Sequence, residues 1–144
     1  MRFEQDLVVE TTAAEAFKAC DSAEQQVRWM ASLVEVQVDA DQPWGVGSRF
    51  RQVHEELGVR QVFEGELLEY EPGRRIVTRL EHDDLSLHDT LEFADLGERC
   101  RILHRVELEL KSTALRLMEG TVGRVLAKRF EEDLARLEDL LETG

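Results

Sequence analysis

The strongest pattern in the chain is an alternation of apolar and polar residues that recurs over its central part. Between residues 34 and 110 the apolar positions recur with a period of two, which is typical of strands with one buried face. Clusters of turn-forming residues interrupt the alternation, as at Pro72-Gly73 and Leu96-Gly97. The pattern predicts strands over residues 2–10, 34–39, 48–55, 59–70, 75–82, 85–93 and 99–110, with the last five pairing as consecutive antiparallel strands.

Two short helices and one long helix complete the predicted element order. The capping box Thr12-Ala13-Ala14-Glu15 opens a helix directly after the first strand, and Asp21-Ser22 caps a second short helix. Residues 112–141 contain no proline and repeat apolar side chains at helical spacing. A meander of this length cannot bury its apolar face alone, so we expect an α+β fold in which the sheet curls around the terminal helix.

Two glycines lie in the middle of the predicted terminal helix. Gly120 and Gly123 each cost roughly 1 kcal/mol relative to alanine there, so a compensating role is expected. Either the missing side chains widen a cavity, or they allow the helix to pack closely on the sheet.

Composition and charge restrict the protein class. A chain of 144 residues with 42% hydrophobic residues fits one domain over residues 1–144 and excludes global disorder. A net charge of −13 disfavours nucleic acid, and the chain has no apolar run long enough for membrane insertion. We therefore expect a cytoplasmic protein in which Cys20 and Cys100 are buried free thiols.

Several segments resemble the SRPBCC or START-like helix-grip superfamily, which includes polyketide cyclases, the birch-pollen allergen and lipid-transfer domains. The resemblance covers nearly the whole chain and lies in the opening strand with residues 12–17, Trp29, the segments 45–51 and 70–76, and the last helix. It implies a helix-grip fold with about seven curved strands and an apolar cavity between the sheet and the helix. It implies no single reaction, so function must be argued from the cavity.

The alternation predicts a polar row on the inner face of the sheet. A two-residue loop at Leu96-Gly97 would place Asp89 opposite His104, and a similar loop at Asp83-Asp84 would place Thr78 opposite Asp89. A carboxylate beside an imidazole can fix its tautomer and raise its pKa, as a general acid or base needs. The same contacts are also expected if His104 and Thr78 only supply the hydrogen bonds that a buried aspartate requires, or if the row orients a polar group of a ligand. Both interpretations stay open.

The remaining candidates follow from the same inner face. His54 is either a second base in the cavity or a strand-end residue in water, whereas His82 and His88 are expected at the surface. No metal-ligand motif is present, and no cofactor is predicted. Trp44 is the portal candidate, and the expected cavity lining comprises Phe50, Gln52, His54, Gln61, Phe63, Thr78, Leu80, Leu87, Leu91, Val106, Met118 and Val122.

We expect this domain to bind a small, mostly apolar, aromatic or lipid-like ligand as a carrier or sensor. Thr78, Asp89, His104, Gln52 and Gln61 would orient the polar end of that ligand. One alternative is a polyketide cyclase/dehydratase-like enzyme in which His104 moves a proton and Asp89 orients it. Another is a protein-interaction module with a filled core, for which the excess acid favours a basic partner. A homodimer is possible.

Overall fold

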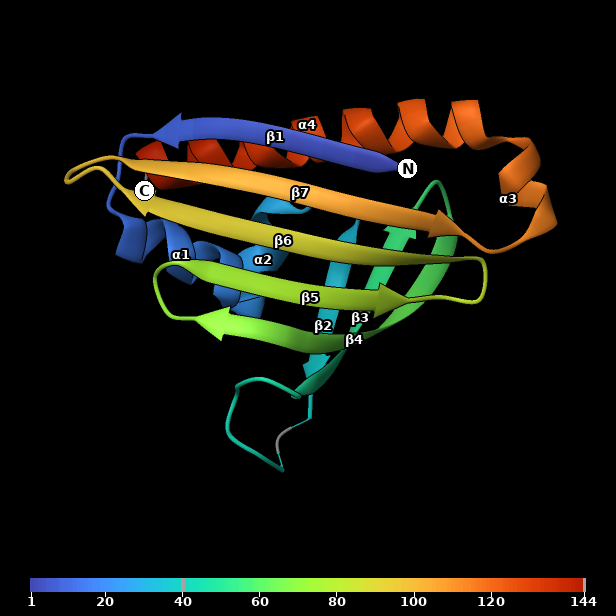
Figure 1. The fold of residues 1–144 in the computed structure, drawn as a ribbon, viewed down its shortest axis with the longest axis horizontal. Helices are drawn as coiled ribbons and strands as arrows, with labels where there is room; N and C mark the ends of the chain where they lie inside the picture. The colour runs from blue at the N-terminus through green and yellow to red at the C-terminus, as the bar shows by residue number, and fades with distance from the viewer. Residues whose placement is uncertain (40, 144) are drawn as a thin grey trace.

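The fold is a single seven-stranded antiparallel sheet that curves around helices at its concave side. The computed structural model describes residues 1–39 and 41–143. The strands follow the order β1-β7-β6-β5-β4-β3-β2, and Figure 1 shows β2 and β3 running steeply across β5 to β7. Their bounds are β1 Arg2–Val9, β2 Leu33–Val38, β3 Arg49–Glu56, β4 Val59–Glu71, β5 Arg75–Glu81, β6 Leu85–Asp95 and β7 Cys100–Leu110.

The helices begin where the sequence supplies caps. The Thr12 hydroxyl accepts from the Glu15 amide at the start of α1 (Ala13–Asp21), and Ser22 caps α2 (Ala23–Trp29) in the same way. The α+β helix-grip fold expected from the sequence is therefore confirmed, with α4 (Glu119–Thr143) as its long C-terminal helix.

The prediction of one unbroken terminal helix is wrong. Ser112 caps a short helix α3 (Thr113–Leu117), and Met118 then leaves the helical region with φ −107° and ψ 21°. Figure 1 shows α3 at an angle to α4. Gly120 and Gly123 consequently lie in the first turns of α4 rather than mid-helix, and a Cβ on Gly123 would be 3.4 Å from the sulfur of Met1. Gly123 therefore serves close packing against the chain start and not the widening of a cavity.

The register between β6 and β7 differs from the prediction by two residues. Asp89 pairs with Val106 and His104 with Leu91, because the connection runs from Leu96 to Arg99 instead of only Leu96-Gly97. The Asp95 carboxylate accepts from the Gly97 amide at 2.8 Å, and Gly97 has φ +90°, which glycine adopts without a steric penalty. A slip of two keeps Asp89 and His104 on the same face, as diagonal neighbours.

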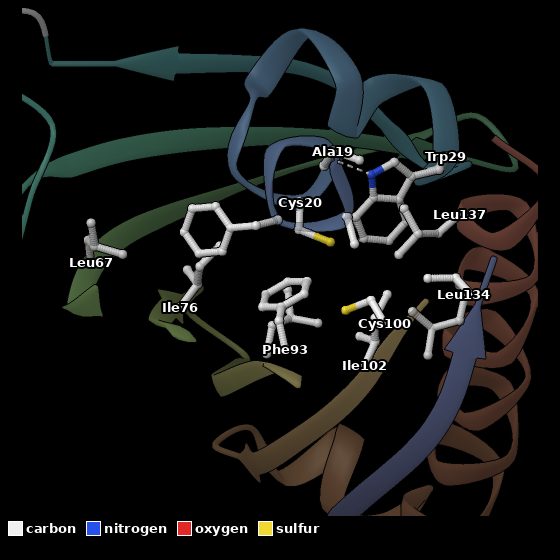
Figure 2. Close-up of a cluster of buried hydrophobic side chains, with 14 residues drawn as sticks. Ala19, Cys20, Trp29, Leu67, Ile76, Phe93, Cys100, Ile102, Leu134 and Leu137 are labelled. Carbon is white, nitrogen blue, oxygen red and sulfur yellow. Dashed lines mark hydrogen bonds between the residues drawn. The ribbon is translucent and has the colours of Figure 1, made fainter. Parts of the chain in front are cut away.

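The hydrophobic core lies at one end of the curved sheet, under α1 and α2 (Figure 2). Cys20 and Cys100 are both free and buried in this cluster, and the Trp29 indole donates to the Ala19 carbonyl at 3.0 Å. Leu137 of α4 is fully buried there. The helix is thus anchored by its C-terminal half, and its N-terminal half spans the other end of the sheet.

Candidate functional site

The N-terminal half of α4 and the concave face of the sheet enclose a cavity of about 570 Å³. Its walls are mostly apolar, with a few polar groups directed inward, which is typical of a small-molecule site. Of the residues expected to line it, the structure places there Trp44, Phe50, Gln52, His54, Gln61, Phe63, Thr78, Leu80, Leu87, Leu91 and Val122, together with Asp89 and His104.

Two expected lining residues lie elsewhere. Val106 faces inward but is completely buried, so it contributes to the packing beneath the cavity and not to its surface. Met118 is 54% exposed because the chain changes direction there, and a helical phase cannot be extrapolated across such a break. Alternation predicts the face that a residue occupies, but not what covers it.

Sequence reasoning also missed several polar residues of the wall, among them Ser32, Arg129 and Asp133. Ser32 precedes β2, and Arg129 and Asp133 come from α4. Arg129 follows Val125 by four positions and Leu126 by three, so it interrupts an apolar stripe. A charge inside this apolar stripe was the signal that could have located this position.

The predicted polar row is present at the middle of the sheet. Thr78 pairs directly with Asp89 across β5 and β6, which confirms that register. The Nε2 of His104 donates to Oδ2 of Asp89 at 3.0 Å, and the ring of Phe130 packs edge-on against the imidazole. Burial disfavours a charged His104, but the charge and hydrogen bond of Asp89, together with the charge of Asp133, raise its pKa above the usual 6.5.

A second polar group surrounds His54. Its Nδ1 accepts from the Ser32 hydroxyl at 2.8 Å, and its Nε2 donates to the Gln52 side-chain oxygen at 3.0 Å. Burial, together with the charge of Arg129, lowers the pKa of His54 to about 4. His54 is therefore a neutral, partly buried residue of the cavity wall, and the alternative of a strand-end histidine in water is wrong.

The other two histidines differ in their surroundings. His88 is exposed on the outer face of β6, as expected. His82 is only 20% exposed, because its ring packs on Phe63 with 5.3 Å between ring centroids. His82 is therefore a partly covered residue beside the turn after β5, and it does not line the main cavity.

Trp44 is held at the cavity wall by a carboxylate. Its indole donates to Oδ1 of Asp21 at 3.0 Å, and the Tyr70 hydroxyl donates to Oδ2 of the same side chain at 2.6 Å. Burial and the hydrogen bond to Asp21 raise the pKa of Tyr70 to about 12, so the hydroxyl stays a donor. These bonds tie the β2–β3 loop to the junction of α1 and α2.

No helix among the described residues is long and apolar enough to cross a membrane. Within residues 1–39 and 41–143, no group of three or more His, Cys, Asp or Glu side chains is arranged to hold a metal ion.

The curved sheet, the terminal helix and the internal cavity define a helix-grip domain. The chain belongs to the family described as "Polyketide cyclase / dehydrase and lipid transport", whose model matches residues 1–142. Family and fold suggest ligand binding or a cyclase/dehydrase-like function. No curated protein matches the sequence.

Several solved structures share the fold at low identity. TTHA0849 from Thermus thermophilus is 17% identical with a TM-score of 0.79, and the match covers 96% of this chain and 95% of that one. Ara h 8.0201 is 13% identical with a TM-score of 0.78, over 100% and 99% of the two chains. StfQ, a di-domain ARO/CYC protein from the steffimycin biosynthetic pathway, is 15% identical with a TM-score of 0.79, and the match covers 97% of this chain but 50% of StfQ. At these identities the likeness shows the fold alone.

Proposed function

We propose that this protein binds a small, mostly apolar or aromatic ligand in the cavity between the sheet and α4. The observation that carries the proposal is the cavity itself, about 570 Å³ in volume and lined by aromatic and aliphatic side chains. Thr78, Asp89 and His104 would orient a polar group of the ligand from the middle of the sheet. An open cavity also weighs against the alternative of an interaction module with a filled core.

The test is a titration with the neutral fluorophore N-phenyl-1-naphthylamine. We expect the wild type to bind it and the variant Leu80→Trp, whose larger side chain narrows the cavity, to bind it at least about tenfold more weakly. Arg79→Trp is the matched control, because Arg79 is exposed and precedes Leu80 on the same strand. Equal binding by all three proteins, or no binding by the wild type, would contradict the proposal. If the wild type binds the fluorophore, the natural ligand can be identified by mass spectrometry of the small molecules extracted from protein purified from its native host.

The second candidate function is a cyclase/dehydratase-like reaction, which the His104–Asp89 hydrogen bond favours. His104 would transfer a proton to or from the bound substrate while Asp89 holds the ring and stabilises its charged form. We expect His104→Gln to abolish turnover of such a substrate while its dissociation constant changes by less than about threefold. Undiminished turnover would exclude His104 as the proton-transfer group.

A further inference from the structure

Arg129 has a distinctive position on α4. Among the residues that the structure describes, it is the one lysine or arginine in the wall of the main cavity. It also lines a second, smaller cavity of about 320 Å³, which shares Ser32, Val125 and Asp133 with the first. Its side chain therefore borders both cavities, and the second one is also lined by Glu55 and Glu56 at the end of β3.

The hydrogen-bonding edge of this guanidinium is only half used. Nη2 forms an ion pair with Oε2 of Glu56, whereas Nε is buried and has no hydrogen-bond partner. Nε and Nη2 together form the edge of an arginine that can bind both oxygens of one carboxylate. The Nε atoms of Arg75 and Arg105 also lack hydrogen-bond partners, although Nε of Arg105 forms an ion pair with Glu4, and neither arginine lines the cavity.

Glu56 is a carboxylate that can be displaced. It ends β3, its side chain is 47% exposed, and the next residues, Leu57 and Gly58, form a tight turn with φ of 52° and 78°. A partly exposed ion pair of this kind contributes only about 0–1 kcal/mol. A carboxylate that engages both nitrogens from the less solvated interior would form two charge-assisted hydrogen bonds in its place.

The neighbouring carboxylate of Asp133 does not occupy the free nitrogen of Arg129, because it is bonded to other groups. Oδ1 of Asp133 accepts from the Ala31 amide at 3.1 Å and from Nη1 of Arg136 at 2.9 Å. Burial lowers the pKa of Arg129, which reflects a cation that has lost part of its hydration, although the charge of Asp133 opposes this shift. The Ser32 and Gln52 side chains beside His54 supply further hydrogen-bonding groups at the same end of the cavity.

We propose that Arg129 binds the carboxylate of an otherwise apolar ligand, and that this carboxylate displaces Glu56. The inference rests on the proposed function, because the apolar body of the ligand would occupy the main cavity. It narrows the ligand class to apolar monocarboxylates.

The test compares decanoate with decanol, two probes of the same chain length, as competitors of bound N-phenyl-1-naphthylamine. We expect decanoate to bind the wild type about tenfold more tightly than decanol. Arg129→Gln should abolish this preference while decanol and the fluorophore still bind, which shows that the cavity is intact. Arg129→Lys should recover only part of it, because lysine keeps the charge but lacks the two-nitrogen edge.

Glu56→Gln provides an independent test in the opposite direction. Removing the internal competitor should tighten decanoate binding several-fold and leave decanol binding unchanged. Arg124→Gln is the control, since Arg124 is an exposed arginine on the same helix that lines neither cavity, and we expect it to keep the wild-type preference.

The outcomes separate the two proposals. Equal affinities for decanoate and decanol in the wild type, or an unchanged preference in Arg129→Gln, would overturn the carboxylate site while ligand binding by the cavity stands. Failure of the wild type to bind the fluorophore or either probe would overturn both.

Discussion

We expect Gly65→Ala to destabilise the protein and to impair ligand binding together. Gly65 on β4 pairs with Phe50 on β3, and a Cβ at Gly65 would lie 2.4 Å from two atoms of the Phe50 ring. The ring is 7% exposed, lines the cavity and packs against Trp44, so it cannot move without disturbing its neighbours. Overpacking of this kind costs about 1–3 kcal/mol of the free energy of unfolding.

Urea denaturation and fluorophore titration measure the two effects. Gly45→Ala is the matched control, because no atom lies within 4 Å of an added Cβ there and the position does not require a positive φ. The double variant Phe50→Leu/Gly65→Ala should lose less stability than the sum of its single variants, since a smaller side chain relieves the clash. A Gly65→Ala protein as stable as Gly45→Ala would show that Phe50 relaxes freely.

The second large effect is the pH dependence of stability, to which the two cavity histidines contribute with opposite signs. The pKa of His104 is raised above 6.5 in the folded protein by Asp89. The stability that the protonated His104 adds to the folded protein is therefore fully present below about pH 6.5. It is lost as the pH rises through the raised pKa. The free energy of unfolding should fall with increasing pH in that window.

His54 acts in the reverse direction at lower pH. Its pKa of about 4 in the folded protein lies below the value of 6.5 in the unfolded chain, so the unfolded state binds the proton more readily. Acidification from about pH 6.5 towards pH 4 should remove up to roughly 3 kcal/mol. Together the two histidines predict a stability maximum close to pH 6.5.

The free energy of unfolding, measured by urea denaturation at pH values between about 5 and 8, tests the expected fall on either side of the maximum. We expect Asp89→Asn to remove the fall in stability above about pH 6.5, because burial, which lowers the pKa of His104, is then opposed only by the charge of Asp133. His54→Gln should reduce only the loss of stability on acidification. His88→Gln, at an exposed position, should leave both parts of the pH dependence unchanged. A wild-type slope above pH 6.5 that persists in Asp89→Asn would rule out the His104–Asp89 pair as its cause.

The local pattern of the chain was sufficient for most of the elements and for the face of each residue. Thr12 and Ser22 are helix caps whose chemistry acts within three residues, and the alternation along β7 assigns its side chains to one face or the other. For the same reason the polar row was predicted correctly although the predicted register between β6 and β7 was wrong. A slip of two residues moved Asp89 to a diagonal position but left it beside His104.

Other features required the tertiary structure. The change of direction at Met118 exposes that side chain, and the packing beneath the cavity covers Val106 although its face was assigned correctly. Neither property is encoded in periodicity, because both depend on elements far away in the sequence.

Strand alternation and helix capping are local physical effects, so the amino-acid pattern was enough to predict an α+β fold with a sheet curled around the terminal helix and the face that most inner residues occupy. Only the tertiary structure decided which polar groups meet in the cavity. The ion pair of Arg129 with Glu56 and the hydrogen bond of Ser32 to His54 join separate segments of the chain, and the cavity wall that these groups share exists only after the sheet has closed on α4.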